Sequence, residues 1–167
     1  MSKALDIRPV TATEAAQLAP LLLEQYQYYS AEPVSYSLDQ LEDYIRQRMF
    51  SDYSGIRVVA AYQGNQMLGF ASFTVMYPVM RLSGQMYMKD LYVAARARGQ
   101  KVGQRLMKHL ARLALQQGCS RLDWTAESDN PKAGEFYNAI CADLLTVKQY
   151  YRFENEALEE FADSIAG

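Results

Sequence analysis

The residues best suited to chemistry form a basic, glycine-containing segment that follows an aromatic and β-branched run. Residues 91–103 read Leu-Tyr-Val-Ala-Ala-Arg-Ala-Arg-Gly-Gln-Lys-Val-Gly. Gly99 and Gly103 let a ligand approach the backbone closely, and a helix is predicted to start immediately afterwards. The first N–H groups of that helix have no internal partners and carry the positive end of its dipole. The segment therefore predicts a site for an anion such as a phosphate.

Two other phosphate-binding patterns do not fit. A P-loop needs Gly-Lys followed by Ser or Thr at the helix start, and a dinucleotide fold needs Gly-x-Gly-x-x-Gly with an acidic residue further on. Neither occurs here. For the loop on its own, an ordinary turn between a strand and a helix remains the alternative.

A second segment, residues 130–137, reads Asn-Pro-Lys-Ala-Gly-Glu-Phe-Tyr. Asn130 is a favourable helix cap and Pro131 suits the first helical position, so a helix should begin here. Tyr137 contributes a phenol that can donate a proton. By spacing alone a core tyrosine is the better interpretation, because Tyr137 shares an apolar stripe with Ala133, Phe136 and Ile140.

Together the two segments resemble the motifs of the GNAT superfamily of N-acetyltransferases. Residues 98–103 are similar to its acyl-CoA loop, Arg/Gln-x-x-Gly-x-Gly/Ala, with Lys101 where the family usually has Gly. Residues 130–137 are similar to its Asn-x-x-Ala-x-x-Phe-Tyr pattern. The resemblance implies that acetyl-CoA is bound by Leu91, Tyr92, Val93, Arg98, Gly99, Gln100, Lys101, Val102, Gly103 and Asn130.

The resemblance also implies direct transfer of an acetyl group from acetyl-CoA to a primary amine, without a covalent enzyme intermediate. A backbone N–H near Val93 would stabilise the oxyanion, and Tyr137 would protonate the departing thiolate. The sequence lacks the motifs expected of an enzyme that forms a covalent intermediate. It has no Gly-x-Ser-x-Gly elbow, and its only histidine, His109, lies in the middle of a predicted helix. With both motifs present, Tyr137 is interpreted as the general acid.

The acceptor is expected to be a small amine, because the chain looks most like the diamine and polyamine branch, which includes spermidine/spermine and thialysine acetyltransferases. Lys89 departs from that branch, which usually carries Glu there. A Lys would repel a polycation and could pair with the carboxylate of an amino-acid-like substrate. Since side chains alternate along a strand, Lys89 and Asp90 are expected to face opposite ways. Cys141 replaces the Gly that usually follows the tyrosine helix, a change expected to affect the turn.

Three carboxylates are candidates for the base that deprotonates the amine, namely Asp90, Glu127 and Asp129. Tyrosines around the loop between the first two helices could line the acceptor pocket, with core packing as the alternative for Tyr26 and Tyr29. The residues assigned to the substrate are Tyr29, Tyr36, Lys89, Asp90 and Glu127. The alternative functions are a non-catalytic acyl-CoA-binding or interaction module and acetylation of a protein or peptide amine.

Composition predicts one soluble domain over residues 1–167. Hydrophobic residues make up 50% of the 167 residues and charged residues 22%, which permits a buried core. No leader and no apolar run near the roughly 18 residues of a membrane span are present, so no membrane association and a cytoplasmic location are expected. Cys119 and Cys141 are expected to be buried free thiols, with no metal bound.

Basic residues are concentrated between Arg96 and Arg121, a stretch without Asp or Glu. Part of this run is the solvated face of a helix, and the rest suits a polyanionic ligand. Nucleic acid is the rival partner, but the net charge of −2, the pI near 5.5 and an acidic C-terminal tail argue against it. A phosphorylated cofactor fits better. A homodimer is expected from the resembling branch.

The hydrophobic pattern predicts an α+β domain with a mixed, mostly antiparallel sheet flanked by helices. Strands are predicted at residues 5–10, 56–62, 67–77, 85–93 and 121–127, with a final strand or hairpin at residues 144–153. Helices should begin at capping boxes over residues 11–14 and 37–40, and again at residues 102 and 131. Pro20 is expected to end or bend the first helix. In the first helix, the residues expected to face the core are Ala15, Leu18, Leu22, Tyr26 and Tyr29. In the second helix they are Leu38, Leu41, Ile45 and Met49.

Overall fold

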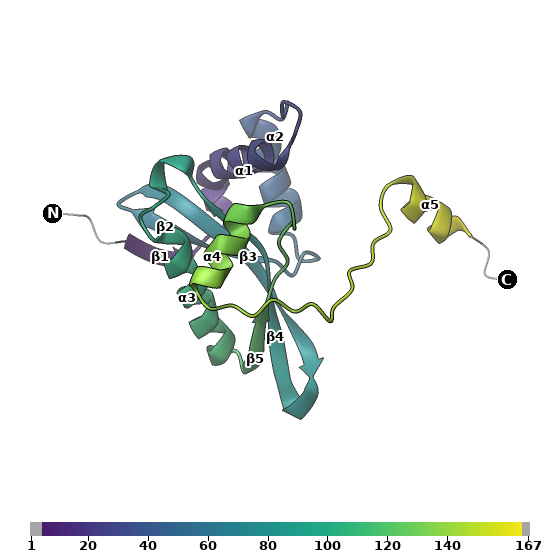
Figure 1. The fold of residues 1–167 in the computed structure, drawn as a ribbon. Helices are drawn as coiled ribbons and strands as arrows, with labels where there is room; N and C mark the ends of the chain where they lie inside the picture. The colour runs from purple at the N-terminus through teal and green to yellow at the C-terminus, as the bar shows by residue number, and fades with distance from the viewer. Residues whose placement is uncertain (1–4, 165–167) are drawn as a thin grey trace. The chain divides into compact units, whose positions relative to one another are not determined.

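The computed structural model describes residues 5–164, and the chain divides between Ala126 and Glu127 into two compact units. The described part of the first unit contains the sheet and its covering helices (Figure 1). The described part of the second unit contains two short helices joined by irregular chain. No helix within residues 5–164 has the length and apolar character needed to cross a membrane.

Within the described residues, the first unit is built on a five-stranded sheet whose strands lie in chain order. Strands β1 to β4 pair antiparallel, and β5 pairs parallel to β4. The predicted mixed, mostly antiparallel sheet is therefore confirmed. The strands are β1 (Leu5–Pro9), β2 (Arg57–Gln63), β3 (Gln66–Val79), β4 (Ser83–Val93) and β5 (Cys119–Asp123).

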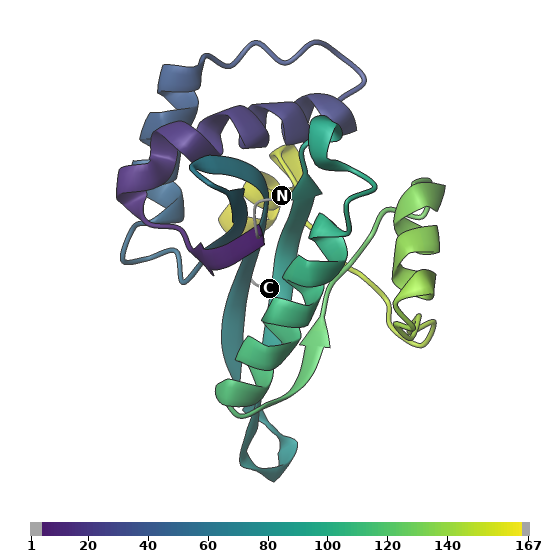
Figure 2. The ribbon, with the colours of Figure 1, turned by 90° about the vertical axis from the view of Figure 1, so that its left-hand side faces the viewer.

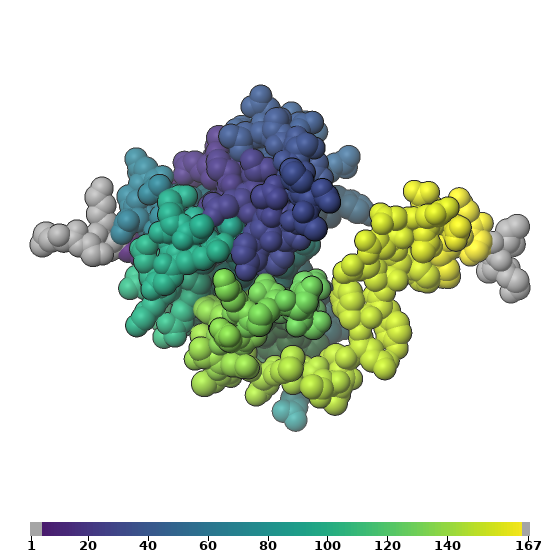
Figure 3. Space-filling view, turned by 45° about the horizontal axis from the view of Figure 1, so that its top comes forward, coloured from purple at the N-terminus to yellow at the C-terminus, as the bar shows by residue number. Residues whose placement is uncertain are grey.

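Helices cover both faces of this sheet (Figure 2). α1 (Ala15–Tyr29) and α2 (Leu38–Tyr44) pack against each other, as the purple and blue side chains of Figure 3 show. α3 (Val102–Gln116) packs against β2, β3 and β4. All residues at 58–62 and 67–73 are buried, and such continuous burial along a strand requires cover on both faces.

The helix starts follow the local sequence signals. Ser37 accepts a hydrogen bond from the Gln40 N–H at 3.1 Å, and the Gln40 side chain accepts one from the Ser37 N–H at 2.9 Å, which completes the predicted capping box. Pro20 was expected to end or bend this helix, and α1 runs through it to Tyr29, so the helix does not end at the proline. Leu18 and Leu22 are buried on both sides of Pro20, and this packing outweighs the lost backbone hydrogen bond.

Two residues predicted to face the core are exposed instead. Tyr29 is 56% exposed and Leu38 is 44% exposed. They are the last residue of α1 and the first of α2, so both border the connecting loop, where the helices leave the core. A π-helical turn, Ile45–Met49, continues α2 and keeps Ile45 buried.

The described residues of the second unit contain α4 (Pro131–Ala139) and α5 (Glu156–Asp163), and no strand. The strand or hairpin predicted at residues 144–153 is therefore wrong, because a strand needs a hydrogen-bonded neighbour and this segment pairs with none. β5 begins at Cys119 and ends at Asp123, earlier than predicted at both ends. Cys119 is buried as predicted, whereas Cys141 is exposed. Cys141 has φ of 61° just after α4, so it takes a left-handed turn position of the kind that favours glycine, and the expected effect of this residue on the turn is confirmed.

Candidate active site

The glycine-containing segment connects β4 to α3, as predicted. Gly99 has φ of 76°, and Lys101, which caps α3, has φ of 61°. Lys101 thus keeps the left-handed backbone that a glycine would adopt, at a cost of about 1–2 kcal/mol. The first hydrogen bond of α3 joins the Arg105 N–H to the Lys101 carbonyl at 3.0 Å. The N–H groups of residues 102–104 precede this bond, so they are available to an anion.

Glu24 of α1 holds the start of this segment against the sheet. Its carboxylate accepts a hydrogen bond from the Ala95 N–H at 2.7 Å and one from the Tyr92 hydroxyl at 3.2 Å. Burial, reinforced by the Glu24 charge, raises the pKa of Tyr92 to about 12, so the phenol stays protonated at neutral pH. Sequence reasoning missed Glu24, because its partners lie far away in the chain and no local motif marks it.

Arg98 braces the same region with its side chain. The guanidinium donates to the Tyr92 hydroxyl at 3.1 Å and to the Val93 carbonyl at 3.3 Å, and it lies 4.9 Å from the centre of the Tyr28 ring. Opposite Val93, Gly69 allows β3 to approach closely, since a Cβ there would lie 2.7 Å from the Tyr92 carbonyl oxygen. These contacts fix the backbone around Val93, where the oxyanion donor is predicted.

β4 extends beyond its parallel neighbour. The pairs between β4 and β5 run from Gly84–Cys119 to Tyr87–Asp123, after which β5 ends and β4 continues to Val93 (Figure 2). In the described first unit, the edge of β4 at residues 88–93 therefore has no strand partner on that side. Such an edge offers N–H and C=O groups to an extended ligand, and it leads directly into the loop before α3.

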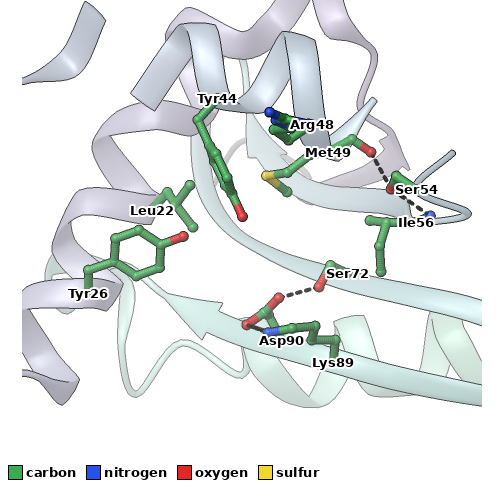
Figure 4. Close-up of a pocket in the computed structure, with 10 residues that line it drawn as sticks. All are labelled: Leu22, Tyr26, Tyr44, Arg48, Met49, Ser54, Ile56, Ser72, Lys89 and Asp90. Atoms are coloured by element: carbon green, nitrogen blue, oxygen red, sulfur yellow. Dashed lines mark hydrogen bonds and ion pairs between the residues drawn. The ribbon is translucent and has the colours of Figure 1, made fainter. Parts of the chain in front are cut away.

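β4 contains a bulge at Lys89. Ser72 pairs with Asp90 and Phe73 pairs with Met88, which leaves Lys89 as the extra residue of β4. The prediction that Lys89 and Asp90 face opposite ways assumed regular alternation and is wrong. Both side chains line one pocket, and the Lys89 Nζ lies 3.7 Å from the Asp90 Oδ1 (Figure 4).

This pocket has a volume of about 170 Å³ and lies between α1, the end of α2, β3 and β4 (Figure 4). Asp90 accepts hydrogen bonds from the Ser72 hydroxyl at 2.5 Å and from the Gln25 amide at 3.1 Å. The hydroxyls of Tyr26 and Tyr44 point into the pocket (Figure 4). Burial raises the pKa of Tyr26 to about 12, so this hydroxyl remains a neutral donor.

The tyrosines assigned to the substrate lie elsewhere in the first unit. Tyr29 and Tyr36 are 56% and 55% exposed and do not line this pocket, whereas Tyr26 does. Sequence reasoning missed Tyr44 and Arg48, which also line it. Their spacing of i and i+4 places them on one face of a helix, and this was the available signal. No group of three or more His, Cys, Asp or Glu side chains within residues 5–164 is placed to hold a metal ion.

The remaining predicted residues, Glu127, Asn130 and Tyr137, belong to the second unit. The Asn130 Oδ1 accepts a hydrogen bond from the Ala133 N–H at 3.3 Å, and Pro131 takes the first helical position, which confirms the predicted cap. This bond leaves the amide N–H groups of Asn130 for a ligand. Tyr137 is half-buried beside Phe136, with ring centres 5.2 Å apart, in a unit whose described side chains include none that is buried.

Comparison with known sequences agrees with the two motifs. The profile of the Acetyltransferase (GNAT) family matches residues 17–142. The thialysine N-epsilon-acetyltransferase of Sus scrofa is 34% identical over 108 residues, and that of Bos taurus is 33% identical over 103 residues. Each match covers 60% of this chain and spans about 60% of the length of the relative. The thialysine N-epsilon-acetyltransferase of Caenorhabditis elegans is 25% identical over 164 residues, covering 96% of this chain and 99% of the relative.

Solved structures share the fold. An integron cassette protein from the mobile metagenome of V. cholerae is 44% identical with a TM-score of 0.90, covering 98% of this chain and 99% of the other. A ribosomal-protein-alanine N-acetyltransferase from Brucella melitensis biovar Abortus 2308 has a TM-score of 0.72 at 21% identity, covering 90% of this chain and 100% of the other. The second similarity concerns the fold alone.

Proposed function

Because the chain belongs to the acetyltransferase (GNAT) family, we propose that it is an N-acetyltransferase that transfers the acetyl group of acetyl-CoA to a primary amine of a small molecule. The observation that carries this proposal is the unpaired edge of β4, which ends at Val93 and leads into the helix start at Val102. The edge suits the amide-containing arm of the cofactor, and the helix start suits its phosphates. Residues 1–167 would act as one catalytic domain.

In this proposal the backbone of Leu91, Tyr92 and Val93 pairs with the arm of acetyl-CoA. The segment from Arg98 to Gly103 shapes the phosphate site, with the Lys101 ammonium adding charge. The Asn130 amide would contact the cofactor arm, and no metal takes part. The names of the relatives support a small amine acceptor, and so does the small volume of the pocket, about 170 Å³.

The reaction needs three contributions from the protein. The amine nitrogen attacks the thioester carbon, and the backbone N–H at Val93 stabilises the charge that develops on the carbonyl oxygen. As the C–S bond breaks, the Tyr137 phenol gives its proton to the sulfur. Before the attack, the substrate ammonium loses one proton to a carboxylate, directly or through water, with Asp90, Glu127 and Asp129 as the candidates. After the attack, the nitrogen gives up its extra proton to the Tyr137 phenolate, directly or through water, which restores the phenol and leaves a neutral amide. Alignment of amine and thioester supplies much of the remaining acceleration.

A screen for release of free CoA tests the proposal. Purified protein is incubated with acetyl-CoA and with polyamines, amino acids or aminoglycosides, and the free thiol is measured. Thiol release that depends on an acceptor, together with an acetylated product by mass spectrometry, is the expected result. Tight acetyl-CoA binding with no thiol released from any acceptor would instead support a non-catalytic acyl-CoA-binding module.

The assembly is proposed to be a homodimer. Within the second unit, the unit's own residues leave Leu144, Val147 and Tyr151 uncovered. Apolar side chains of this kind are often buried in an interface, and a second copy of the chain is the partner proposed here. Sedimentation equilibrium should give twice the 19.0 kDa chain mass. A monomer at micromolar concentration would contradict this expectation.

The positive charge of the Lys101 ammonium is expected to contribute to acetyl-CoA binding. Lys101→Ala should weaken acetyl-CoA binding about two- to fivefold at low salt and less at high salt, because exposed charges are screened within roughly 8–10 Å at moderate ionic strength. Lys101→Gly should weaken acetyl-CoA binding by the same factor as Lys101→Ala. It should also raise the free energy of unfolding by about 1 kcal/mol, because glycine relieves the strain of the left-handed φ of 61°. Calorimetric titration at two salt concentrations and thermal unfolding measure both effects. Parental affinity of both variants at low salt would show that the ammonium faces away from the phosphates.

A further inference from the structure

The Asp90 carboxylate is held at both oxygens by buried side chains. The Gln25 amide donates to the Oδ1 at 3.1 Å, and the Ser72 hydroxyl donates to the Oδ2 at 2.5 Å. Gln25 is 6% exposed and Ser72 is 1% exposed, and Ser72 lines the pocket at the β4 bulge whereas Gln25 does not (Figure 4). The Asp90 side chain itself remains 21% exposed, so its carboxylate is fixed by the protein and still accessible from the pocket.

The stability of the fold does not account for a glutamine at position 25. Its Oε1 is buried and has no hydrogen-bond partner among the described residues. Such an acceptor costs free energy, whereas an apolar side chain of similar shape would leave no polar group unsatisfied. What the amide provides is the hydrogen bond to Asp90. A polar group placed at such a cost is more typical of a functional site than of a core.

Other carboxylates of the first unit are held differently. Glu24 accepts a hydrogen bond from the Ala95 backbone N–H at 2.7 Å, and Glu14 accepts one from the Thr11 N–H at 3.2 Å. A backbone N–H can donate but never accept, so it cannot follow a carboxyl group that changes from acceptor to donor. Within residues 5–164 no backbone N–H donates to the Asp90 side chain, and its two partners, an amide and a hydroxyl, can each donate or accept. The surroundings of Asp90 therefore suit a carboxylate that takes up and releases a proton.

Asp90 is also the carboxylate best placed to receive a proton in this pocket. The charged and titratable groups that face it there are two cations, Lys89 and Arg48, and two phenols, Tyr26 and Tyr44 (Figure 4). No second carboxylate among the described residues lines the pocket. The other candidates for the base, Glu127 and Asp129, belong to the second unit, and within that unit no described residue donates a hydrogen bond to their carboxylates. A base must be positioned near the proton that it takes, and Asp90 is the candidate that is held in place.

We propose that Gln25 and Ser72 are positioning residues of the acetyl transfer, and that Asp90, held by them, is the base that deprotonates the acceptor. The inference rests on the proposed acetyl transfer and selects one of its three candidate carboxylates.

The two contacts serve Asp90 before and after it takes the proton. An N–H bond of the acceptor ammonium breaks, its electron pair stays on the nitrogen, and the proton passes to an Asp90 oxygen. Val93 lies three residues beyond Asp90, ~10 Å along a strand, so water relays the proton from an amine at the thioester. The Ser72 hydroxyl can then turn to accept from the new O–H, while the Gln25 amide continues to donate to the other oxygen. The acid keeps its orientation and returns the proton to water in the pocket.

Thiol release with cadaverine, a simple diamine, or with the acceptor that the screen identifies, measures the effect of each residue. Gln25→Met and Ser72→Ala should each lower kcat about tenfold, by the strength of a hydrogen bond to a charged group, and leave the KM for the acceptor nearly unchanged. In an Asp90→Asn background neither substitution should lower kcat further, because a positioning residue then has no base to position. Gln17→Met is the control, since Gln17 is an exposed residue of the same helix, and its kcat should equal that of the parent.

Carbon NMR of the Asp90 carboxyl group tests the positioning without turnover. Its resonance should shift in Gln25→Met and in Ser72→Ala and stay in place in Gln17→Met. Shifted resonances without thiol release from any acceptor would uphold the positioning and contradict the proposed transfer. A parental kcat in both variants, with only the free energy of unfolding lowered, would show a structural role and overturn the inference. Equal losses of kcat in the parent and in the Asp90→Asn background would overturn it as well.

Discussion

Replacing Tyr137 by Phe is expected to lower the turnover number about 10²- to 10⁴-fold while acetyl-CoA affinity stays nearly unchanged. The substitution removes one hydroxyl and keeps the ring that lies 5.2 Å from that of Phe136. A general acid acts only as the C–S bond breaks, so its loss affects the transition state and leaves the ground state alone. Single-turnover thiol release measures the step without interference from product dissociation.

The control for this experiment is Tyr150→Phe, a change of the same size in the same unit. Tyr150 is 71% exposed and has no assigned role in the reaction, so its variant should turn over like the parent. If Tyr137 served only for packing, its Phe variant would show a small change in stability and normal turnover. A single-turnover rate equal to that of the parent, where chemistry limits the rate, would exclude Tyr137 as the proton donor.

Features determined by neighbouring residues could be predicted from the sequence. The capping box at Ser37 and Gln40 and the cap at Asn130 formed as expected, because each needs only residues within one helical turn. The loop before α3 also lies where the glycines and the following apolar pattern place it. Lys101 shows how firmly this local geometry is set, since a non-glycine residue retains the left-handed conformation there.

Features that depend on distant partners could not be predicted in the same way. The bulge at Lys89 arises from the register between β3 and β4, and it invalidated an argument based on regular alternation. Glu24 contacts Ala95 across 71 positions of sequence, so no spacing rule identifies it. Residues 144–153 have the composition of a strand, but within residues 5–164 they pair with no strand, and composition alone does not make a strand.

Asp90→Asn is expected to lower kcat/KM for the acceptor about 100-fold without changing acetyl-CoA affinity. Asn keeps the shape of the side chain but removes the charge that balances Lys89, so the acceptor ammonium would meet an uncompensated cation. The fold should tolerate this change, because the Gln25 amide can turn its unpartnered Oε1 toward the new amide and the Ser72 hydroxyl can rotate. The free energy of unfolding should therefore fall by less than about 1 kcal/mol.

The double variant Lys89→Met/Asp90→Asn distinguishes two roles for Asp90. If Asp90 binds the acceptor ammonium, removing the uncompensated Lys89 charge should restore part of the lost affinity for cadaverine, measured as a lower KM than in Asp90→Asn. If Asp90 is instead the base, kcat stays low in both variants, because no carboxylate remains to take the proton. The same kcat/KM in Asp90→Asn and the parent, for every acceptor that is turned over, would assign both tasks to other groups, with Glu127 and Asp129 as the remaining candidates for the base.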